Sequence, residues 1–279
     1  MIAKYLRFPG GKRKVLTFSY DDGVEQDIRL IEIFRKYGMR ATFNLNSALY
    51  SPEGTVHPEG KIHRRMTQAQ VKDTYLEDVC EVACHTANHP MLTDCDTAVV
   101  CDQVLSDRKA LETLFERQIH GMAYPFGPTN DRVVQCLKDC GIWYSRTVVS
   151  TEKFDMPTDW LRLPATCHHK NPRLMELADK FLSNDSRHQP IMFYVWGHAY
   201  EFEEKNNWEI IENFCEKMSG QEDIWYATNM EVYTAVKDYE RLESSADGTR
   251  IYNPSVRSVW ISDSKSNVYE IKPGETIYV

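Results

Sequence analysis

The sequence of 279 residues lacks the features that mark membrane proteins and nucleic-acid-binding proteins. No apolar run approaches the roughly 18 residues that a membrane-spanning helix needs. The N-terminal residues also lack the long apolar stretch of a signal peptide, so we expect a cytoplasmic protein. An excess of basic charge is missing too, because 41 acidic residues outnumber 33 Lys and Arg and give a net charge of −8. This balance argues against nucleic acid or an anionic membrane as the main partner.

Nucleotide-binding and zinc-ribbon signatures are absent as well. The chain has neither G-x-G-x-x-G after its first apolar run nor the phosphate-binding pattern G-x-x-x-x-G-K-[ST]. Its eight cysteines include no C-x-x-C pair, which argues against a structural zinc ribbon. Without an export signal, we expect these thiols to be reduced.

The chain does contain a repeated alternation of short apolar runs with helical patterns. The first run, at residues 15–20, is followed at 24–38 by apolar residues that recur at helical spacing. A long loop is expected at 51–65, which holds two prolines, two glycines and two histidines. Strands that alternate with helices predict a parallel sheet. About seven such units favour an α/β fold of the distorted (β/α)7-type barrel class over an open doubly wound sheet.

The pattern changes near the C-terminus. From about Gly248, short alternating runs with polar breaks replace the helical spacing. We therefore predict a barrel at residues 1–245 and a small β appendage at 246–279 that packs on it.

Carboxylates and imidazoles gather where the predicted strands end. Asp21 and Asp22 end the first strand, His85 and His89 follow the third, and His198 follows a late apolar strand. Catalytic groups of such barrels lie at the carboxyl ends of the strands, so we expect these side chains to meet. Two imidazoles and one carboxylate are typical ligands of zinc or a similar divalent ion. A solvated acidic turn, two capping histidines and a core histidine are the alternatives for these residues.

The two adjacent aspartates invite a division of roles. Neighbouring side chains in a strand point to opposite faces. We therefore expect one of them to bind the metal and the other to remain free as a base.

The first two of these segments resemble specific motifs of a known family. Ser-Tyr-Asp-Asp-Gly at 19–23 resembles T-F-D-D-G, and His-Thr-Ala-Asn-His at 85–89 resembles H-[ST]-x-x-H. Both motifs are those of the NodB-type polysaccharide deacetylases, the metal-dependent family of carbohydrate esterases. The resemblance implies a distorted barrel of about seven strands.

Three looser matches follow in the order that the family shows. Ala-Tyr-Pro-Phe-Gly at 123–127 stands where the family has R-x-P-Y-G. Asp159 and Trp160 are candidates for the fourth motif, an acidic residue close to a tryptophan. Trp-Gly-His at 196–198 resembles the final L-x-H. The resemblance therefore extends from about Thr17 to His198.

Carried over position by position, the resemblance implies a mechanism for removing an acetyl group. Asp22, His85 and His89 would hold a divalent ion, most simply Zn²⁺, with Co²⁺, Ni²⁺ or Mn²⁺ as alternatives. Asp21 would act as the general base on water, and His198 would protonate the leaving amine or hydroxyl.

The same resemblance implies the surroundings of the reacting group. The backbone N–H of Phe126, beside Tyr124 in the third motif, would help the metal to hold the oxyanion. Trp160 and Trp196 would form walls of the pocket against the acetyl methyl or the sugar face.

Two positions of this sequence depart from the family pattern. The arginine that pairs with the base is Ala123 here, so we expect a raised pKa for Asp21. Arg162 is our candidate replacement, although it fits a surface arginine equally well. Asp159 is expected to orient His198 and tune its pKa. Trp196 replaces a leucine and changes the apolar wall.

The sequence thus predicts a hydrolase that removes acetyl groups from an amino sugar or an acetylated oligo- or polysaccharide. A metal-independent amide or ureide hydrolase on the same fold and a non-catalytic carbohydrate-binding protein are the alternatives. A phosphatase with paired aspartates on magnesium fits less well, because magnesium prefers oxygen ligands to histidines. The expected partner is an acetylated carbohydrate, and the sequence specifies neither its identity nor the oligomeric state.

Overall fold

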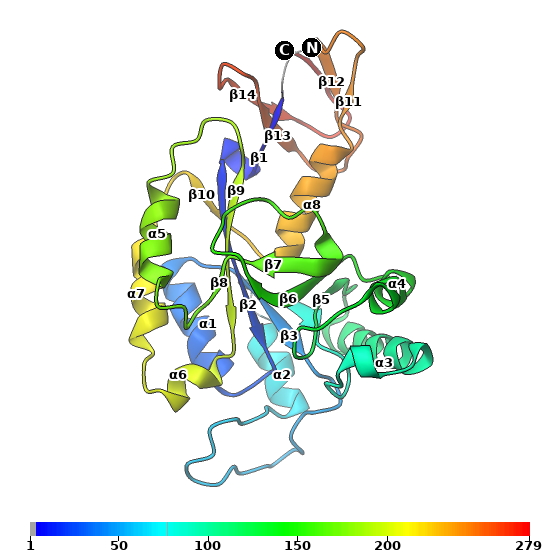
Figure 1. The fold of residues 1–279 in the computed structure, drawn as a ribbon, viewed down its shortest axis with the longest axis vertical. Coiled ribbons are helices and arrows are strands. Elements are labelled where there is room, and N and C mark those ends of the chain that lie inside the picture. The colour runs from blue at the N-terminus through cyan, green and yellow to red at the C-terminus, as the bar shows by residue number, and fades with distance from the viewer. Residues whose placement is uncertain (1–3, 77) are drawn as a thin grey trace.

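The computed structural model describes residues 4–76 and 78–279, and a parallel sheet forms its centre (Figure 1). The strands of this sheet are β2 (Lys14–Asp21), β3 (Ala41–Leu45), β4 (Cys80–Cys84), β5 (Gly121–Ala123), β6 (Tyr144–Ser150), β7 (Leu163–Ala165), β8 (Cys167–His168), β9 (Ile191–Gly197) and β10 (Ile224–Tyr226). Their order is β7-β6-β5-β4-β3-β2-β9-β8, and β10 pairs with the first half of β2. Every pairing in this sheet is parallel.

Strands β7 and β8 close the sheet into a barrel. Strand β7 pairs with β6 at one edge, β8 pairs with β9 at the other, and only Thr166 separates β7 from β8. Counted as one broken strand, β7–β8 completes a ring of seven strands with β2, β3, β4, β5, β6 and β9. The prediction of a distorted (β/α)7-type barrel is therefore confirmed.

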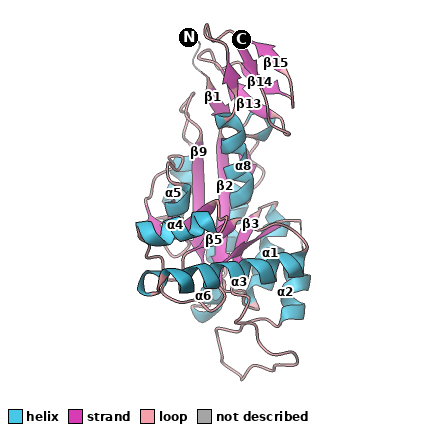
Figure 2. Ribbon diagram, turned by 90° about the vertical axis from the view of Figure 1, so that its right-hand side faces the viewer, coloured by secondary structure: helices cyan, strands magenta, loops and turns pink. Residues whose placement is uncertain are grey.

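Helices surround the barrel (Figures 1 and 2). They are α1 (Gln26–Tyr37), α2 (Gln68–Tyr75), α3 (Thr97–Phe115), α4 (Asp131–Asp139), α5 (Leu174–Leu182), α6 (Tyr200–Glu204), α7 (Glu209–Met218) and α8 (Asn229–Glu240). Thr67 caps α2 and Thr228 caps α8, each in a reciprocal capping box. Helix α1 ends at Gly38, whose φ of 68° is the left-handed conformation that glycine adopts without a steric penalty.

Aromatic side chains fill the space between the sheet and the helices. Phe18 of β2 packs on Phe34 of α1 with a centroid distance of 4.6 Å, and edge-on against Phe214 of α7 at 6.0 Å. Burying each such ring contributes about 2 to 3 kcal/mol to stability. The helices on this side are therefore fixed to the strand that carries the acidic motif.

The C-terminal residues form two small antiparallel sheets. One contains β1 (Tyr5–Arg7), β13 (Val259–Ser262) and β14 (Val268–Ile271), and the other contains β11 (Glu243–Ser244), β12 (Arg250–Tyr252) and β15 (Thr276–Tyr278). Strand β1 comes from the other end of the chain, and Tyr5 pairs with Ser262. Figure 1 shows these sheets at the end of the molecule opposite the carboxyl end of β2.

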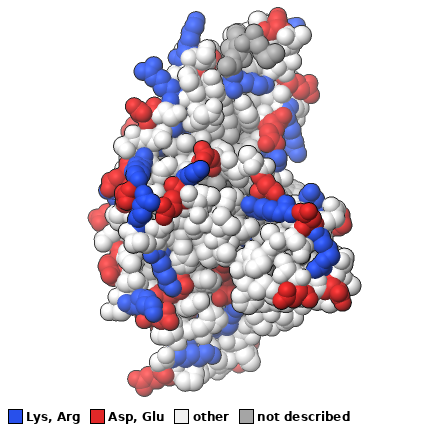
Figure 3. All heavy atoms as spheres, viewed as in Figure 1, with Lys and Arg blue, Asp and Glu red and all other residues white. Residues whose placement is uncertain are grey.

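The surface carries charges of both signs. Figure 3 shows Lys and Arg interspersed with Asp and Glu over the face that it displays. Within the described part of the chain, no helix is both long enough and apolar enough to cross a bilayer.

Candidate active site

The carboxyl ends of β2, β4 and β9 bring five predicted residues together. Asp21 Oδ2 lies 3.9 Å from Nε2 of His85 and 3.9 Å from Nε2 of His198. Ligand atoms of Asp22, His85 and His89 lie within 4.8 Å of one another. Side chains that are far apart in sequence thus form one group at the carboxyl end of the barrel.

The backbone explains how two adjacent aspartates reach the same group. Strand β2 ends at Asp21, and Asp22 follows with a φ of 89°, outside the strand conformation. Its N–H donates to the carbonyl of Asn44 at 3.0 Å, which holds this turn. Strand alternation therefore does not apply at Asp22, and both carboxylates face the histidines.

Asp21 is held from two sides inside the barrel. Arg146 of β6 donates from Nη2 to Oδ2, and Asn44 donates from Nδ2 to Oδ1 at 2.8 Å. The guanidinium carbon of Arg146 lies 4.4 Å from the centroid of the Trp196 ring. Since Asp21 and Arg146 are both fully buried, this ion pair is dry and fixed in orientation.

The expectation of a raised pKa for Asp21 is wrong. Burial opposes ionisation, but the charge of Arg146, followed by His85 and His198, holds the pKa of Asp21 below its ordinary value. The cation that is missing at Ala123 is supplied by the neighbouring strand. The only hint in the sequence is a charged residue inside a segment predicted to be a strand.

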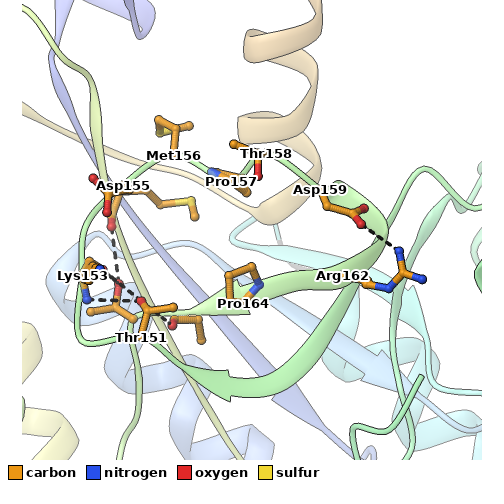
Figure 4. Close-up of a pocket in the computed structure, with 12 residues that line it drawn as sticks. Thr151, Lys153, Asp155, Met156, Pro157, Thr158, Asp159, Arg162 and Pro164 are labelled. Carbon is orange, nitrogen blue, oxygen red and sulfur yellow. Dashed lines mark hydrogen bonds and ion pairs between the residues drawn. The ribbon is translucent and has the colours of Figure 1, made fainter. Parts of the chain in front are cut away.

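Arg162 and Asp159 belong to another part of the surface (Figure 4). Arg162 pairs with Asp159 at 3.0 Å and also with Asp131, so it does not replace the family arginine. Asp159 also accepts a hydrogen bond from the Leu161 N–H at 3.0 Å. Both residues border a cavity of about 310 Å³. The predicted contact between Asp159 and His198 is therefore not what the structure shows.

The two histidines of the metal motif present suitable donor atoms. His85 Nδ1 lies 2.8 Å from the carbonyl oxygen of Ala123, so Nδ1–H donates there and Nε2 keeps its lone pair. His89 Nε2 lies 3.1 Å from His85 Nε2. Burial lowers the pKa of His85. Burial, with a smaller contribution from the charge of His85, lowers the pKa of His89 to about 4. Both imidazoles are neutral near pH 7, as a metal ligand must be.

The long loop at 51–65 supplies two further contacts that the sequence did not reveal. Arg65 Nη2 donates to Asp22 Oδ1 at 2.9 Å, and His63 Nε2 lies 3.2 Å from Oδ2. Burial opposes ionisation of Asp22, but His63 and then Arg65 hold its pKa well below the ordinary value. The carboxylate is therefore ionised at neutral pH and can serve as a ligand.

The place expected for Asp159 beside His198 is occupied by Glu201. Glu201 Oε1 lies 3.7 Å from His198 Nδ1. The sequence offered a signal for this neighbour, since the two residues are three apart where a helix begins.

The predicted pocket residues divide into two groups. The Phe126 ring meets His89 edge-on at a centroid distance of 4.5 Å and is 57% exposed, so it borders the site. Trp196 lies beside His198, with a centroid distance of 6.0 Å between the two rings. Tyr124 instead donates its hydroxyl to a backbone carbonyl at 2.7 Å, and Trp160 packs against α8. The contacts of Tyr124 and Trp160 are thus those of core residues.

Comparison with protein families supports the resemblance seen in the motifs. The family model described as polysaccharide deacetylase matches residues 8–145, which include both the aspartate pair and the histidine pair. Residues 8–145 belong to the polysaccharide deacetylase family. A search of the curated proteins found no match.

Several solved structures are similar to this chain. A family 4 carbohydrate esterase from Streptomyces lividans in complex with acetate is 14% identical, with a TM-score of 0.50 over 76% of this chain and 91% of that one. This likeness shows the shared fold. A CE4 family pseudoenzyme from Bacillus anthracis is 17% identical, with a TM-score of 0.48 over 82% of this chain and 68% of that one.

A deacetylase from Streptococcus pyogenes in complex with acetate is 21% identical, with a TM-score of 0.42 over 47% of this chain. The match covers 55% of the Streptococcus pyogenes protein. A second match, to a polysaccharide deacetylase from Bacillus cereus, covers 44% of the Bacillus cereus protein. The matched part of this chain thus spans about half the length of each of these two proteins.

Proposed function

We propose that this chain is a metal-dependent hydrolase that removes an acetyl group from an amino sugar or an acetylated oligo- or polysaccharide. One observation carries the proposal: a group of two neutral imidazoles and one carboxylate lies beside a second, separately held carboxylate. Membership of residues 8–145 in the polysaccharide deacetylase family supports the assignment.

The donor set of Asp22, His85 and His89 suits Zn²⁺, with Co²⁺, Ni²⁺ or Mn²⁺ as alternatives. A divalent ion there lowers the pKa of a bound water towards ~7 and polarises the acetyl carbonyl. The hydrogen bond from His85 Nδ1 to the Ala123 carbonyl fixes the tautomer that such an ion requires.

Asp21 acts as the general base in this proposal. Arg146 and Asn44 fix its carboxylate and keep it ionised at neutral pH. It takes one proton from the attacking water, whose oxygen forms the new bond to the acetyl carbon. The backbone N–H of Phe126 supplies a hydrogen bond to the oxyanion.

His198 acts as the general acid. Its Nε2 faces Asp21, on the side where the reaction takes place. It gives a proton to the leaving nitrogen or oxygen as the bond from that atom to the acetyl carbon breaks. The products are acetate and a free amine or hydroxyl.

The test is release of acetate from a panel of N-acetylated and O-acetylated oligosaccharides. We expect chelation to abolish release and Zn²⁺ or Co²⁺ to restore it. Asp21→Asn should bind metal normally and lose at least about 100-fold in rate, because the base is removed. His89→Gln should lose metal as well as activity.

Other outcomes favour the alternatives. Hydrolysis of an amide or ureide that survives complete chelation would support the metal-independent enzyme. Binding of acetylated sugars with no turnover, unchanged by Asp21→Asn, would support the carbohydrate-binding protein.

A further inference from the structure

A second group of histidines lies next to the proposed active site. It consists of Glu201 at the start of α6 and the four residues that surround its carboxylate, which are His168, His169, Lys170 and His198. We propose that Glu201 is the positioning residue for His198. The inference rests on the proposed function, in which His198 is the general acid.

His198 lies between two carboxylates on opposite sides of its ring. Nε2 lies 3.9 Å from Asp21 Oδ2, and Nδ1 lies 3.7 Å from Glu201 Oε1. Nδ1 is buried and makes no hydrogen bond within the described part of the chain. A separation of 3.7 Å is longer than a hydrogen bond, but catalytic hydrogen bonds are often long before substrate binds. The geometry leaves Glu201 as the acceptor that Nδ1–H faces.

The backbone holds this pair at short range. Strand β9 ends one residue before His198, and the N–H of Glu201 donates to the carbonyl of His198 at 3.1 Å. The two residues therefore belong to one tight turn, which keeps their Cα atoms close together.

The Glu201 carboxylate is anchored through one oxygen, and two imidazoles lie close to the other. Oε1 accepts a hydrogen bond from Lys170 Nζ at 2.6 Å. Oε2 lies 3.2 Å from His168 Nε2 and 3.1 Å from His169 Nε2, and within the described residues neither contact has the geometry of a hydrogen bond. Burial opposes ionisation, but these three partners and His198 hold the pKa of Glu201 far below its ordinary value. The carboxylate stays charged and keeps its orientation.

The ring of His169 makes the cluster rigid. It stacks on Phe202 at a centroid distance of 4.1 Å and lies parallel to the Tyr20 ring at 5.8 Å. A Cβ at position 197 would lie 2.1 Å from His169 Nδ1, so only Gly197 leaves room for this ring under β9. The absence of a side chain at Gly197 thus allows the His169 ring to pack in this group.

A metal ion is the competing occupant, because ligand atoms of His168, His198 and Glu201 lie within 4.8 Å of one another. The tautomer of His168 argues against it. The N–H of Lys170 donates to His168 Nδ1 at 3.1 Å, so in the neutral ring Nε2 carries the proton and has no lone pair for an ion. His85 has the opposite arrangement, with its Nε2 lone pair left for an ion.

The test compares Glu201→Gln with Asp159→Asn, the carboxylate that the sequence suggested. We expect Glu201→Gln to lower kcat about 100-fold with little change in KM and none in metal content. Asp159→Asn should stay within twofold of wild type. Glu201→Asp, which keeps the charge, should recover much of the loss.

The pH profile separates positioning from a merely structural role. The groups that face His198 are Asp21 from β2, Glu201 and Tyr200 from α6, and His168 from β8. Removing the negative charge of Glu201 makes His198 lose its proton at lower pH. The alkaline limb of the kcat profile should therefore move to lower pH in Glu201→Gln.

Two further measurements decide the outcome. In a His198→Ala background, Glu201→Gln should cause no additional loss, since it acts through that imidazole. Nitrogen-15 spectra, with His198 assigned from the His198→Ala variant, should show a protonated Nδ1 that changes in Glu201→Gln. These spectra test the inference even if no substrate on the panel is hydrolysed.

Three results would overturn the inference. One is full activity in Glu201→Gln together with a large loss in Asp159→Asn. Another is a wild-type chain that binds two equivalents of Zn²⁺ and loses one on Glu201→Gln, which would identify a second metal site. The third is a His198 Nδ1 signal that is the same with and without Glu201.

Discussion

At the scale of single residues, the base and the acid of the proposed site each have a partner from an unexpected element. Asp21 pairs with Arg146 of β6, and His198 faces Glu201 of α6. Neither partner belongs to a motif that the sequence made visible. Arg146 stands in a strand between Ser145 and Thr147, and Glu201 is one of several acidic residues in a short helix. Only the packed structure identifies which charge lies beside which group.

Removing the charge of Arg146 tests its pairing with Asp21. We expect Arg146→Met to lower the free energy of unfolding at pH 7 by about 3 to 5 kcal/mol, because a buried carboxylate loses its counterion. In wild type the depressed pKa of Asp21 contributes stability above the unfolded pKa, and this is lost as pH falls through the folded pKa. The difference between Arg146→Met and wild type should therefore shrink in acid, as urea titrations at several pH values would show.

The pH profile of activity gives an independent reading of the same variant. Without Arg146, Asp21 takes up a proton at higher pH, so the acid limb of kcat/KM should move to higher pH. Arg162→Met is the matched control, because that guanidinium pairs with Asp159 and Asp131 on the surface. An unshifted limb in Arg146→Met would show that Asp21 is not the group that titrates.

At the scale of elements, the break between β7 and β8 is where the barrel closes. Thr166 stands at the break, and its Oγ1 accepts from the Tyr194 N–H at 3.1 Å and donates to the Lys153 carbonyl at 3.0 Å. The hydroxyl of Thr166 thus makes hydrogen bonds with a backbone N–H and a backbone carbonyl at the point where the strand is interrupted.

Thr166→Val keeps the shape of the side chain but removes both hydrogen bonds. We expect the free energy of unfolding to fall by about 1 to 3 kcal/mol, because the buried Tyr194 N–H loses its partner, whereas the Lys153 carbonyl keeps a contact with Thr151 Oγ1. Thr166→Ser, which loses only a methyl group, should cost less than half as much. Urea unfolding checks both values, and equal losses in the two variants would show that the methyl group matters more than the hydroxyl.

At the same scale, the elements themselves were largely predictable from the sequence. Alternation of apolar runs with helical spacing identified most strands and helices, because each buries a regular stripe against the barrel. The strand-end positions of Asp21, His85 and His198 followed from that pattern. The split of one strand into β7 and β8 did not, since Thr166 reads as an ordinary strand residue.

At the scale of the whole molecule, the C-terminal sheets depend on both ends of the chain. Tyr5 in β1 pairs with Ser262 in β13, and Leu6 and Phe8 belong to the apolar cluster beneath β2 and β9. The sequence predicted the β character of the appendage from its local alternation. It gave no sign that β1 joins it, because a pairing between positions so far apart leaves no local pattern.

Truncation after residue 245 tests this dependence. The deletion removes β13, so β1 loses its partner and the apolar cluster beneath it is uncovered. We expect a lower thermal midpoint for the barrel, followed by circular dichroism, while metal stoichiometry at the distant strand ends stays the same. An unchanged midpoint would instead establish residues 1–245 as an independently stable domain.

The pairing of β1 with β13 also sets the order in which the protein can be completed on the ribosome. Strand β1 (Tyr5–Arg7) is translated long before its partner at Val259–Ser262. Throughout elongation the edge of β1 has no strand to pair with, and such exposed edges promote association between nascent chains. The sheet of β1, β13 and β14 therefore closes only after Val259–Ser262 has been synthesised, later than the aspartates and histidines of the proposed site.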